Sequence, residues 1–219
     1  MPEPRTITTT YVKTIGVELE GGWDEVPEGC TIVGDGSVMV RSRHVGEIRS
    51  PVFNSVYEIG PWVESAYPQT VGKSCGIHVH MAFGVNNDGV VSLLSDTDDY
   101  RRFLMRHLHY WGSRNKVRLS YFWDRLDGLN NFCLARDNGR SVFPYIGELG
   151  DGGDRYTQVN FCSYRNHKTV EVRVLPAFKS KRLAADAIVN VALATDTFVF
   201  GSLSRLGDPE VVSSPSVEI

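Results

Sequence analysis

The chain has 219 residues, of which 42% are hydrophobic and 22% charged, and its formal net charge is −3 at pH 7. This length is enough for a self-sufficient hydrophobic core, and the charge argues against a nucleic-acid partner, which normally requires a basic surface. We therefore expect one soluble domain over residues 1–206 and a loosely ordered tail over residues 207–219, which are rich in Pro, Ser and Val.

Cysteine usage and chain composition predict a cytoplasmic protein with no membrane partner. The four cysteines are far apart in the sequence and include no C-x-x-C pair, so we expect reduced thiols. The first ten residues are polar and contain proline, unlike a secretory signal peptide. The longest apolar stretch, residues 184–200, is interrupted by Asp186, Asn190 and Asp196, so we expect a buried helix there rather than a membrane span.

The predicted elements mix short strands with longer helices. Segments in which aliphatic and ionisable residues alternate are expected to be strands, and segments with apolar residues at helical spacing are expected to be helices. Glycine clusters at 21–22, 34–36 and 147–153 are typical of turns or mobile loops. In chain order we expect strands at 14–20 and 46–49, a helix within 55–66, a strand at 76–83, a helix at 98–111, a less regular strand at 156–164, a strand at 169–174 and a helix from 181 to about 200.

The four regular strands separate their aliphatic and ionisable residues in the same way. In residues 14–20, for example, the aliphatic side chains point one way and Glu18 and Glu20 point the other. If these strands share one sheet, the helices cover its apolar face, and the opposite face collects carboxylates, imidazoles and arginines. The residues expected on that polar face are Glu18, Glu20, Glu47, Arg49, His78, His80, Glu171 and Arg173.

The residue types on this face favour a binding site, although an antiparallel sheet often turns one face to water without any further role. Carboxylates crowded together repel one another, and divalent cations between them relieve that repulsion. Carboxylate and imidazole ligands together suit Mg²⁺ or Mn²⁺, and the forked guanidinium groups of Arg49 and Arg173 suit phosphate or carboxylate groups.

These parts indicate phosphoryl transfer, in which a protein mainly positions substrates and offsets negative charge. No nucleotide-binding glycine loop is present. Gly72-Lys73-Ser74 is similar to the end of a P-loop, but Tyr67 stands where its first glycine should be. Metal ions and arginines are therefore expected to hold any nucleotide.

Five segments follow one another in a recognisable order: Gly16-Val17-Glu18-Leu19-Glu20, Asp35-Gly36-Ser37, Gly46-Glu47-Ile48-Arg49-Ser50-Pro51, Cys75-Gly76-Ile77-His78-Val79-His80 and Thr169-Val170-Glu171-Val172-Arg173. This order resembles the amidoligase family, a small branch of the glutamine synthetase-like carboxylate–amine ligases. The resemblance covers about residues 15–194. It implies a fold like the glutamine synthetase catalytic domain, with a curved, mainly antiparallel sheet, helices packed on one face and a metal and nucleotide site on the other.

The resemblance also implies a role for each matching residue. Two or more Mg²⁺ or Mn²⁺ ions would be bound by four carboxylates and one imidazole, with Glu18 and Glu171 also serving catalysis. His80 would contact nucleotide phosphate, Arg173 would stabilise the transferring phosphoryl group, and Arg155 matches a second phosphate-binding arginine by approximate position. The implied metal ligands are Glu18, Glu20, Glu47, His78 and Glu171.

The implied reaction is ATP-dependent amide formation. ATP would phosphorylate a substrate carboxylate, and an amine would then attack the acyl phosphate to form an amide or isopeptide bond. Because no ammonia-binding carboxylate can be matched, we expect a larger amine, such as an amino acid, a peptide or a protein lysine.

Residues 147–153 are expected either to close over the site or to form an ordinary surface loop. Asp35-Gly36-Ser37 is typical of a turn, and its place in the pattern equally suggests a site role.

Three alternatives remain open. The same fold could hydrolyse amide or isopeptide bonds, since the metal ligands do not distinguish the two directions. The H-x-H pair could belong to a metal-dependent hydrolase of another fold, although residues 81–84 lack the Glu that a cupin would place there. A non-catalytic binding module on a ligase scaffold is disfavoured because every ligand position keeps a chemically competent side chain.

Overall fold

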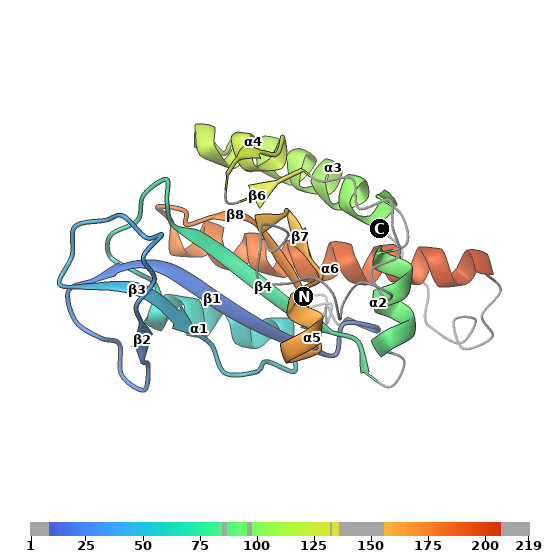
Figure 1. The fold of residues 1–219 in the computed structure, drawn as a ribbon, viewed down its shortest axis with the longest axis horizontal. Coiled ribbons are helices and arrows are strands. Elements are labelled where there is room, and N and C mark those ends of the chain that lie inside the picture. The colour runs from blue at the N-terminus through green and yellow to red at the C-terminus, as the bar shows by residue number, and fades with distance from the viewer. Residues whose placement is uncertain (1–8, 85–86, 96–97, 132, 136–155, 207–219) are drawn as a thin grey trace, which may run out of the picture.

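The structure is a computed structural model that describes residues 9–84, 87–95, 98–131, 133–135 and 156–206. Figure 1 shows a sheet of long, twisted strands lying against helices. The expected α+β class and the mainly antiparallel sheet are confirmed. Arg155, residues 147–153 and the tail over 207–219 lie outside the described residues.

The main sheet of the described chain has the strand order β2-β3-β1-β4-β8-β7, and every neighbouring pair is antiparallel. The long central strands come from widely separated parts of the chain, and their pairing brings residues far apart in sequence onto one surface. The strands are β1 (Thr14–Trp23), β2 (Ile32–Val33), β3 (His44–Arg49), β4 (Gly76–Ala82), β7 (Val159–Asn160) and β8 (Val170–Pro176), with β5 (Leu129–Asn130) and β6 (Cys133–Leu134) in a small separate ribbon.

The three expected helices form, together with others that the sequence pattern did not indicate. Pro61 lies in the first turn of its helix, where backbone N–H groups have no helical acceptor, and it therefore does not interrupt the helix. The helices are η1 (Val56–Glu58), α1 (Ile59–Ala66), α2 (Asn87–Ser95), α3 (Asp99–Arg114), α4 (Ser120–Leu126), α5 (Ser163–His167) and α6 (Lys181–Leu206).

The hydrophobic core lies between the sheet and its helices. Ile15, Val17 and Leu19 of β1 are buried in the same cluster as the aliphatic residues of β4 and β8 and the apolar faces of α1, α3, α4 and α6. Burying a side chain of this kind contributes roughly 1.5–3 kcal/mol. The core therefore fixes which side of each strand points away from the helices.

The polar residues of α6 hold other segments in place. The Asp196 carboxylate accepts hydrogen bonds from the backbone N–H groups of residues 10–12, and the Asp186 carboxylate accepts one from the Trp111 indole. The segment Lys181–Arg205 is long and apolar enough to cross a membrane. This is weak evidence for a membrane span, because core helices of other proteins have the same length and composition, and half of the most apolar window of this helix is buried.

Two local expectations were wrong. Gly21 and Gly22 lie inside β1 and form no turn. A Cβ atom at Gly21 would be 2.4 Å from the Cβ of Pro68, and one at Gly22 would be 2.5 Å from the Cβ of Ser42, so these glycines let neighbouring loops pack against the strand. The irregular strand expected over 156–164 shrinks to Val159–Asn160, because the chain enters α5 at Ser163.

Candidate functional site

Strand register brings the predicted polar residues together on the sheet face away from the core helices. Glu18 of β1 lies opposite both Arg49 of β3 and His78 of β4. His80 of β4 lies opposite Glu171 of β8. Antiparallel pairing thus converts the alternation seen in each segment into one contiguous cluster.

This polar face is not a solvated surface. Glu20, His78 and Glu171 are each only 4% exposed, and Glu47 is 8% exposed. Carboxylates are almost never buried to this extent without partners, because removing a charge from water is costly. The alternative of an ordinary water-facing sheet therefore does not describe these residues.

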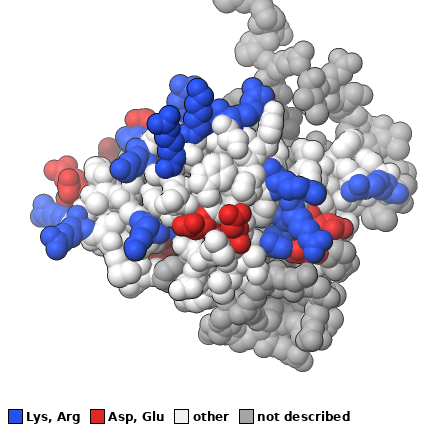
Figure 2. Space-filling model, turned by 90° about the horizontal axis from the view of Figure 1, so that it is seen from above, with Lys and Arg blue, Asp and Glu red and all other residues white. Residues whose placement is uncertain are grey.

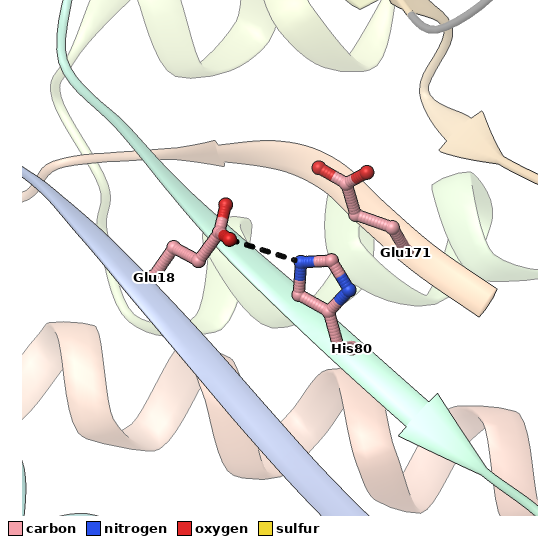
Figure 3. Close-up of side chains that lie close together, drawn as sticks. All are labelled: Glu18, His80 and Glu171. Carbon is pink, nitrogen blue, oxygen red and sulfur yellow. Dashed lines mark ion pairs between the residues drawn. The ribbon is translucent and has the colours of Figure 1, made fainter. Parts of the chain in front are cut away.

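Three side chains in the middle of the sheet converge, and we call Glu18, His80 and Glu171 the central group. Figure 3 shows them pointing toward one another from three adjacent strands. One ligand atom of each lies within 4.8 Å of the others, close enough to hold a single cation. The Nε2 atom of His80 lies 3.6 Å from Oε1 of Glu18 and is buried without a hydrogen-bond partner.

His78 connects the central group to its neighbours. Its Nδ1 lies 3.0 Å from Oε2 of Glu18 and 3.5 Å from Oε1 of Glu171, and its Nε2 lies 3.4 Å from Oε1 of Glu20. Both ring nitrogens therefore face carboxylates. The position fits the metal-ligand role that the sequence pattern implied for His78, and the geometry brings His80 to the same carboxylates.

A second set of carboxylates lies toward the β2 edge of the sheet, and we call Glu20, Asp35 and Glu47 the edge group. Their ligand atoms also lie within 4.8 Å of one another. Glu20 is directly opposite Glu47 in the β1–β3 pairing, and like charges in that position are destabilising. A divalent cation bound by carboxylate oxygens would offset this repulsion, so the donor types of the edge group suit Mg²⁺ or Mn²⁺.

The electrostatics of the two groups differ. Burial alone would raise the pKa of Glu18, but the neighbouring imidazoles of His78 and His80 bring that pKa well below its usual value. Burial also acts to raise the pKa of Glu171, and the charge of Arg173 outweighs it, so this pKa is lowered too. The pKa of Glu47, in contrast, is raised by burial and by the charge of Glu18, despite Arg49.

Two arginines border the carboxylates. The Arg49 guanidinium donates to Oε1 of Glu47 at 2.6 Å, while its side chain remains 61% exposed. Arg173 Nη1 donates to Oε1 of Glu171 at 2.5 Å, and its Nε is buried without a partner. The Arg173 guanidinium also lies over the Tyr156 ring. Each arginine keeps donor capacity beyond its carboxylate partner, which suits an additional anion.

Arg125 of α4 lies behind the cluster and was not indicated by the sequence. It is 2% exposed, and its Nη1 donates to the backbone oxygen of Arg173 at 3.0 Å. The β4–β8 register shifts at this point: one residue of β4 between Ile77 and Val79 faces two residues of β8. Such a bulge leaves a carbonyl without its ladder partner. Arg125 supplies that partner and so holds the part of β8 that carries Arg173.

Gly76 lies where this arginine and the carboxylates meet. Its N–H donates to Oε2 of Glu20 at 2.5 Å. A Cβ atom at this position would lie 3.1 Å from the same Glu20 oxygen, 3.2 Å from Nη1 of Arg125 and 3.2 Å from Nε2 of His78. The missing side chain leaves room for three polar groups to approach one another.

The sequence pattern did not indicate Asn160 and Arg125, and it left the role of Asp35 open. Asn160 Nδ2 donates to Oε2 of Glu171 at 2.6 Å and so orients the carboxylate. The alternation of Gln158 and Asn160 in an otherwise irregular segment is the one signal that could have placed Asn160 on the polar face. Asp35 both forms the expected turn, accepting from the Ser37 N–H at 2.7 Å, and joins the edge group.

The surface over α3 and α4 has a mixed charge pattern. Figure 2 shows that face with Lys and Arg in separate groups, with Asp and Glu between some of them and mostly uncharged residues elsewhere. Arg101 of α3 is engaged internally, because it donates to Asp98 and, at 2.9 Å, to Oε1 of the buried Gln158. This arginine therefore ties α3 to the β7 side of the sheet.

Comparisons of the chain with protein-family models, with curated proteins and with solved structures each found no match.

Proposed function

We propose that this chain is an ATP- and divalent-cation-dependent carboxylate–amine ligase that forms an amide or isopeptide bond through an acyl-phosphate intermediate. We also propose that its fold is of the glutamine synthetase catalytic-domain type, in the amidoligase branch. The observation that carries the proposal is the set of four carboxylates, three of them buried, with two imidazoles and two arginines on one face of the sheet.

The donor set supports a site for two cations. The central group offers carboxylate oxygens and an unpartnered imidazole nitrogen, and the edge group offers carboxylate oxygens alone. Hard divalent cations such as Mg²⁺ prefer oxygen ligands, and Mn²⁺ also accepts imidazole. We assign one ion to each group, with His78 between them. When bound, the ions would lower the negative charge between a nucleotide phosphate and a substrate carboxylate.

The proposed reaction has two balanced steps. A substrate carboxylate oxygen attacks the γ-phosphorus of ATP, which breaks the bond to ADP and gives an acyl phosphate. An amine nitrogen then attacks the acyl carbon, inorganic phosphate leaves, and the amine loses a proton. In the proposal Arg173, held by Glu171 and Arg125, binds the transferring phosphoryl group, and Arg49 at the exposed rim binds a further phosphate or carboxylate.

We further propose an amino acid, a peptide or a protein lysine as the amine, and the cytoplasm as the place of the reaction. Arg155 stays a predicted phosphate contact. In this proposal the arginines beside the carboxylates favour synthesis over hydrolysis, because amide hydrolysis has no phosphate to bind.

The test is a product search with the pure protein, Mg²⁺, ATP and a pool of amino acids and peptides. We expect ADP release that depends on the amine, and mass-spectrometric products that weigh one water less than the sum of two reactants. Amide or isopeptide cleavage without ATP would instead establish the hydrolase alternative. Tightly bound stoichiometric zinc in the purified protein, with no ATP turnover, would establish a metal-dependent hydrolase.

A further inference from the structure

The inner edge of the His80 ring contacts two hydroxyl groups. Its Nδ1 lies 3.2 Å from Oγ of Ser163 and 3.2 Å from Oγ1 of Thr169, and the two hydroxyls lie 2.9 Å apart. A short helix and a reversal bring them together. Ser163 begins α5, and Lys168 after the helix has a φ of 57°, in the left-handed region, so that the chain turns back and places Thr169 beside Ser163.

The opposite edge of the same ring faces the carboxylates. Nε2 of His80 is buried, has no hydrogen-bond partner, and points to the space that Glu18 and Glu171 share. A buried ring nitrogen without a partner is uncommon and calls for an explanation. The ring is thus held by two hydroxyl groups on one side and faces carboxylates on the other.

We propose that Ser163 and Thr169 are positioning residues that accept the Nδ1–H of His80 and thereby present the Nε2 lone pair to a divalent cation shared with Glu18 and Glu171. Histidines that bind metals usually donate their other ring N–H to an oxygen, which fixes both tautomer and orientation. A hydroxyl oxygen has lone pairs to accept that proton while its own hydrogen bonds to the neighbouring hydroxyl.

This inference rests on the cation site of the proposed function, and it differs from the sequence-based expectation for His80. The family resemblance implied a contact with nucleotide phosphate, for which Nε2 would have to carry a proton. The hydroxyl pair beside Nδ1 and the carboxylate pair beside Nε2 favour the cation.

The first test is an Mn²⁺ titration followed by electron paramagnetic resonance, with Mn²⁺ as the only ligand. We expect the double variant Ser163→Ala, Thr169→Val to bind the central Mn²⁺ about 10- to 100-fold more weakly, the usual effect of removing an outer hydrogen-bond partner. The matched variant Thr169→Ser keeps the hydroxyl and should retain affinity within about threefold. Cooperative thermal unfolding at an unchanged midpoint shows that each variant is folded. Unchanged affinity in the folded double variant would overturn the inference.

The second test is independent of any substitution. Nitrogen-15 NMR of the ion-free wild-type protein, at a pH where the His80 ring is neutral, reports which ring nitrogen carries the proton. We expect the Nδ1–H tautomer, and the Nε2–H tautomer would overturn the inference even if the double variant failed to fold.

The outcomes separate this inference from the proposed function. Hydroxyl-dependent Mn²⁺ binding without amine-dependent ATP turnover supports the inference and contradicts the ligase. ATP-dependent ligation, combined with an Mn²⁺ affinity that does not change when the hydroxyls are removed, supports the ligase and contradicts the inference. A wild-type protein that binds no Mn²⁺ contradicts both.

Discussion

The central group and the edge group hold similar carboxylates in different electrostatic surroundings. Glu18 and Glu171 are flanked by imidazoles and by Arg173, and their pKa values are lowered. Glu47 faces Glu20 across a strand pair, and its pKa is raised by burial and by the charge of Glu18. The protein supplies its own positive charge at the central group, so that group stays ionised. The edge group has an excess of negative charge, and an added cation therefore has more repulsion to relieve there.

The largest effect is expected from Glu171→Gln, which removes charge from the central group. Amine-dependent ATP turnover should fall by at least about 100-fold, because a preorganised electrostatic contact is lost. The matched control is Glu64→Gln, at a residue that is 71% exposed and pairs with Lys181 far from the site. ADP release measured under saturating Mg²⁺ compares the two, and equal activities would remove Glu171 from the site.

Arg125 donates to the backbone beside the site, and Arg125→Met should lower the stability of the folded protein. The substitution leaves the backbone oxygen of Arg173 without its Arg125 donor, while the backbone oxygen of Cys75 keeps only the N–H of Ala177. We expect a loss of about 2–4 kcal/mol in the free energy of unfolding, measured by urea denaturation. Arg118→Met, at an exposed position, should change it by less than about 0.5 kcal/mol. A small loss at Arg125 would show that the bulge of β8 needs no support.

The sequence indicated the polar face well because each long strand repeats the same two-residue alternation. Ile15 and Glu18 fall on opposite faces whatever the rest of the fold does, and the same holds in β4 and β8. The antiparallel register then decides which carboxylates meet, and that information is not local. Glu20 opposite Glu47 is visible only once β1 and β3 are paired.

Other features depend on tertiary contacts that no local pattern carries. Arg125 lies on a helix of seven residues, and its burial against β8 overrides the usual preference of arginine for the surface. A glycine such as Gly21 looks the same in the sequence whether it forms a turn or lets a residue such as Pro68 approach a strand. His78 and His80 share one face by periodicity, so only their neighbours distinguish them, and for His80 those neighbours are Ser163 and Thr169.

Gly76→Ala tests how tightly the two groups are coupled. Its methyl group would press on Glu20, His78 and Arg125 at 3.1–3.2 Å, and flexible side chains can yield only in part. Overpacking of this mild kind costs about 1 kcal/mol, so we expect about fivefold weaker Mn²⁺ binding. Gly16→Ala is the matched control on the same face, since its methyl group would meet only the Cβ of His80 at an ordinary 3.6 Å. Equal affinities in the two variants would show that the groups are not crowded.

The smallest expected effect is on the free energy of unfolding, whose pH dependence should differ between the two groups. The raised pKa of Glu47 favours its protonated form in the folded state, so its contribution to stability is present at low pH and is lost as pH rises through the raised value. Glu47→Gln should therefore gain stability over wild type toward neutral pH, by no more than about 1 kcal/mol because the variant also loses the ion pair with the exposed Arg49.

The contribution of Glu171 to stability should change with pH in the opposite direction. Its lowered pKa stabilises the folded state above the ordinary carboxylate value, and this contribution is lost as pH falls through the lowered value. Glu171→Gln should be less stable than wild type at neutral pH, with the difference shrinking in acid. Free energies of unfolding of the metal-free proteins across this range check both signs, and parallel curves for the two variants would contradict the contrast between the groups.

The most direct measurement is anomalous X-ray scattering from crystals of the protein grown with Mn²⁺ and a non-hydrolysable ATP analogue. We predict one manganese peak coordinated by Glu18 and Glu171, a second coordinated by Glu20 and Glu47, and nucleotide phosphates next to Arg173. Manganese bound elsewhere, or none within coordination distance of these four carboxylates, would contradict the proposed metal-dependent ligase.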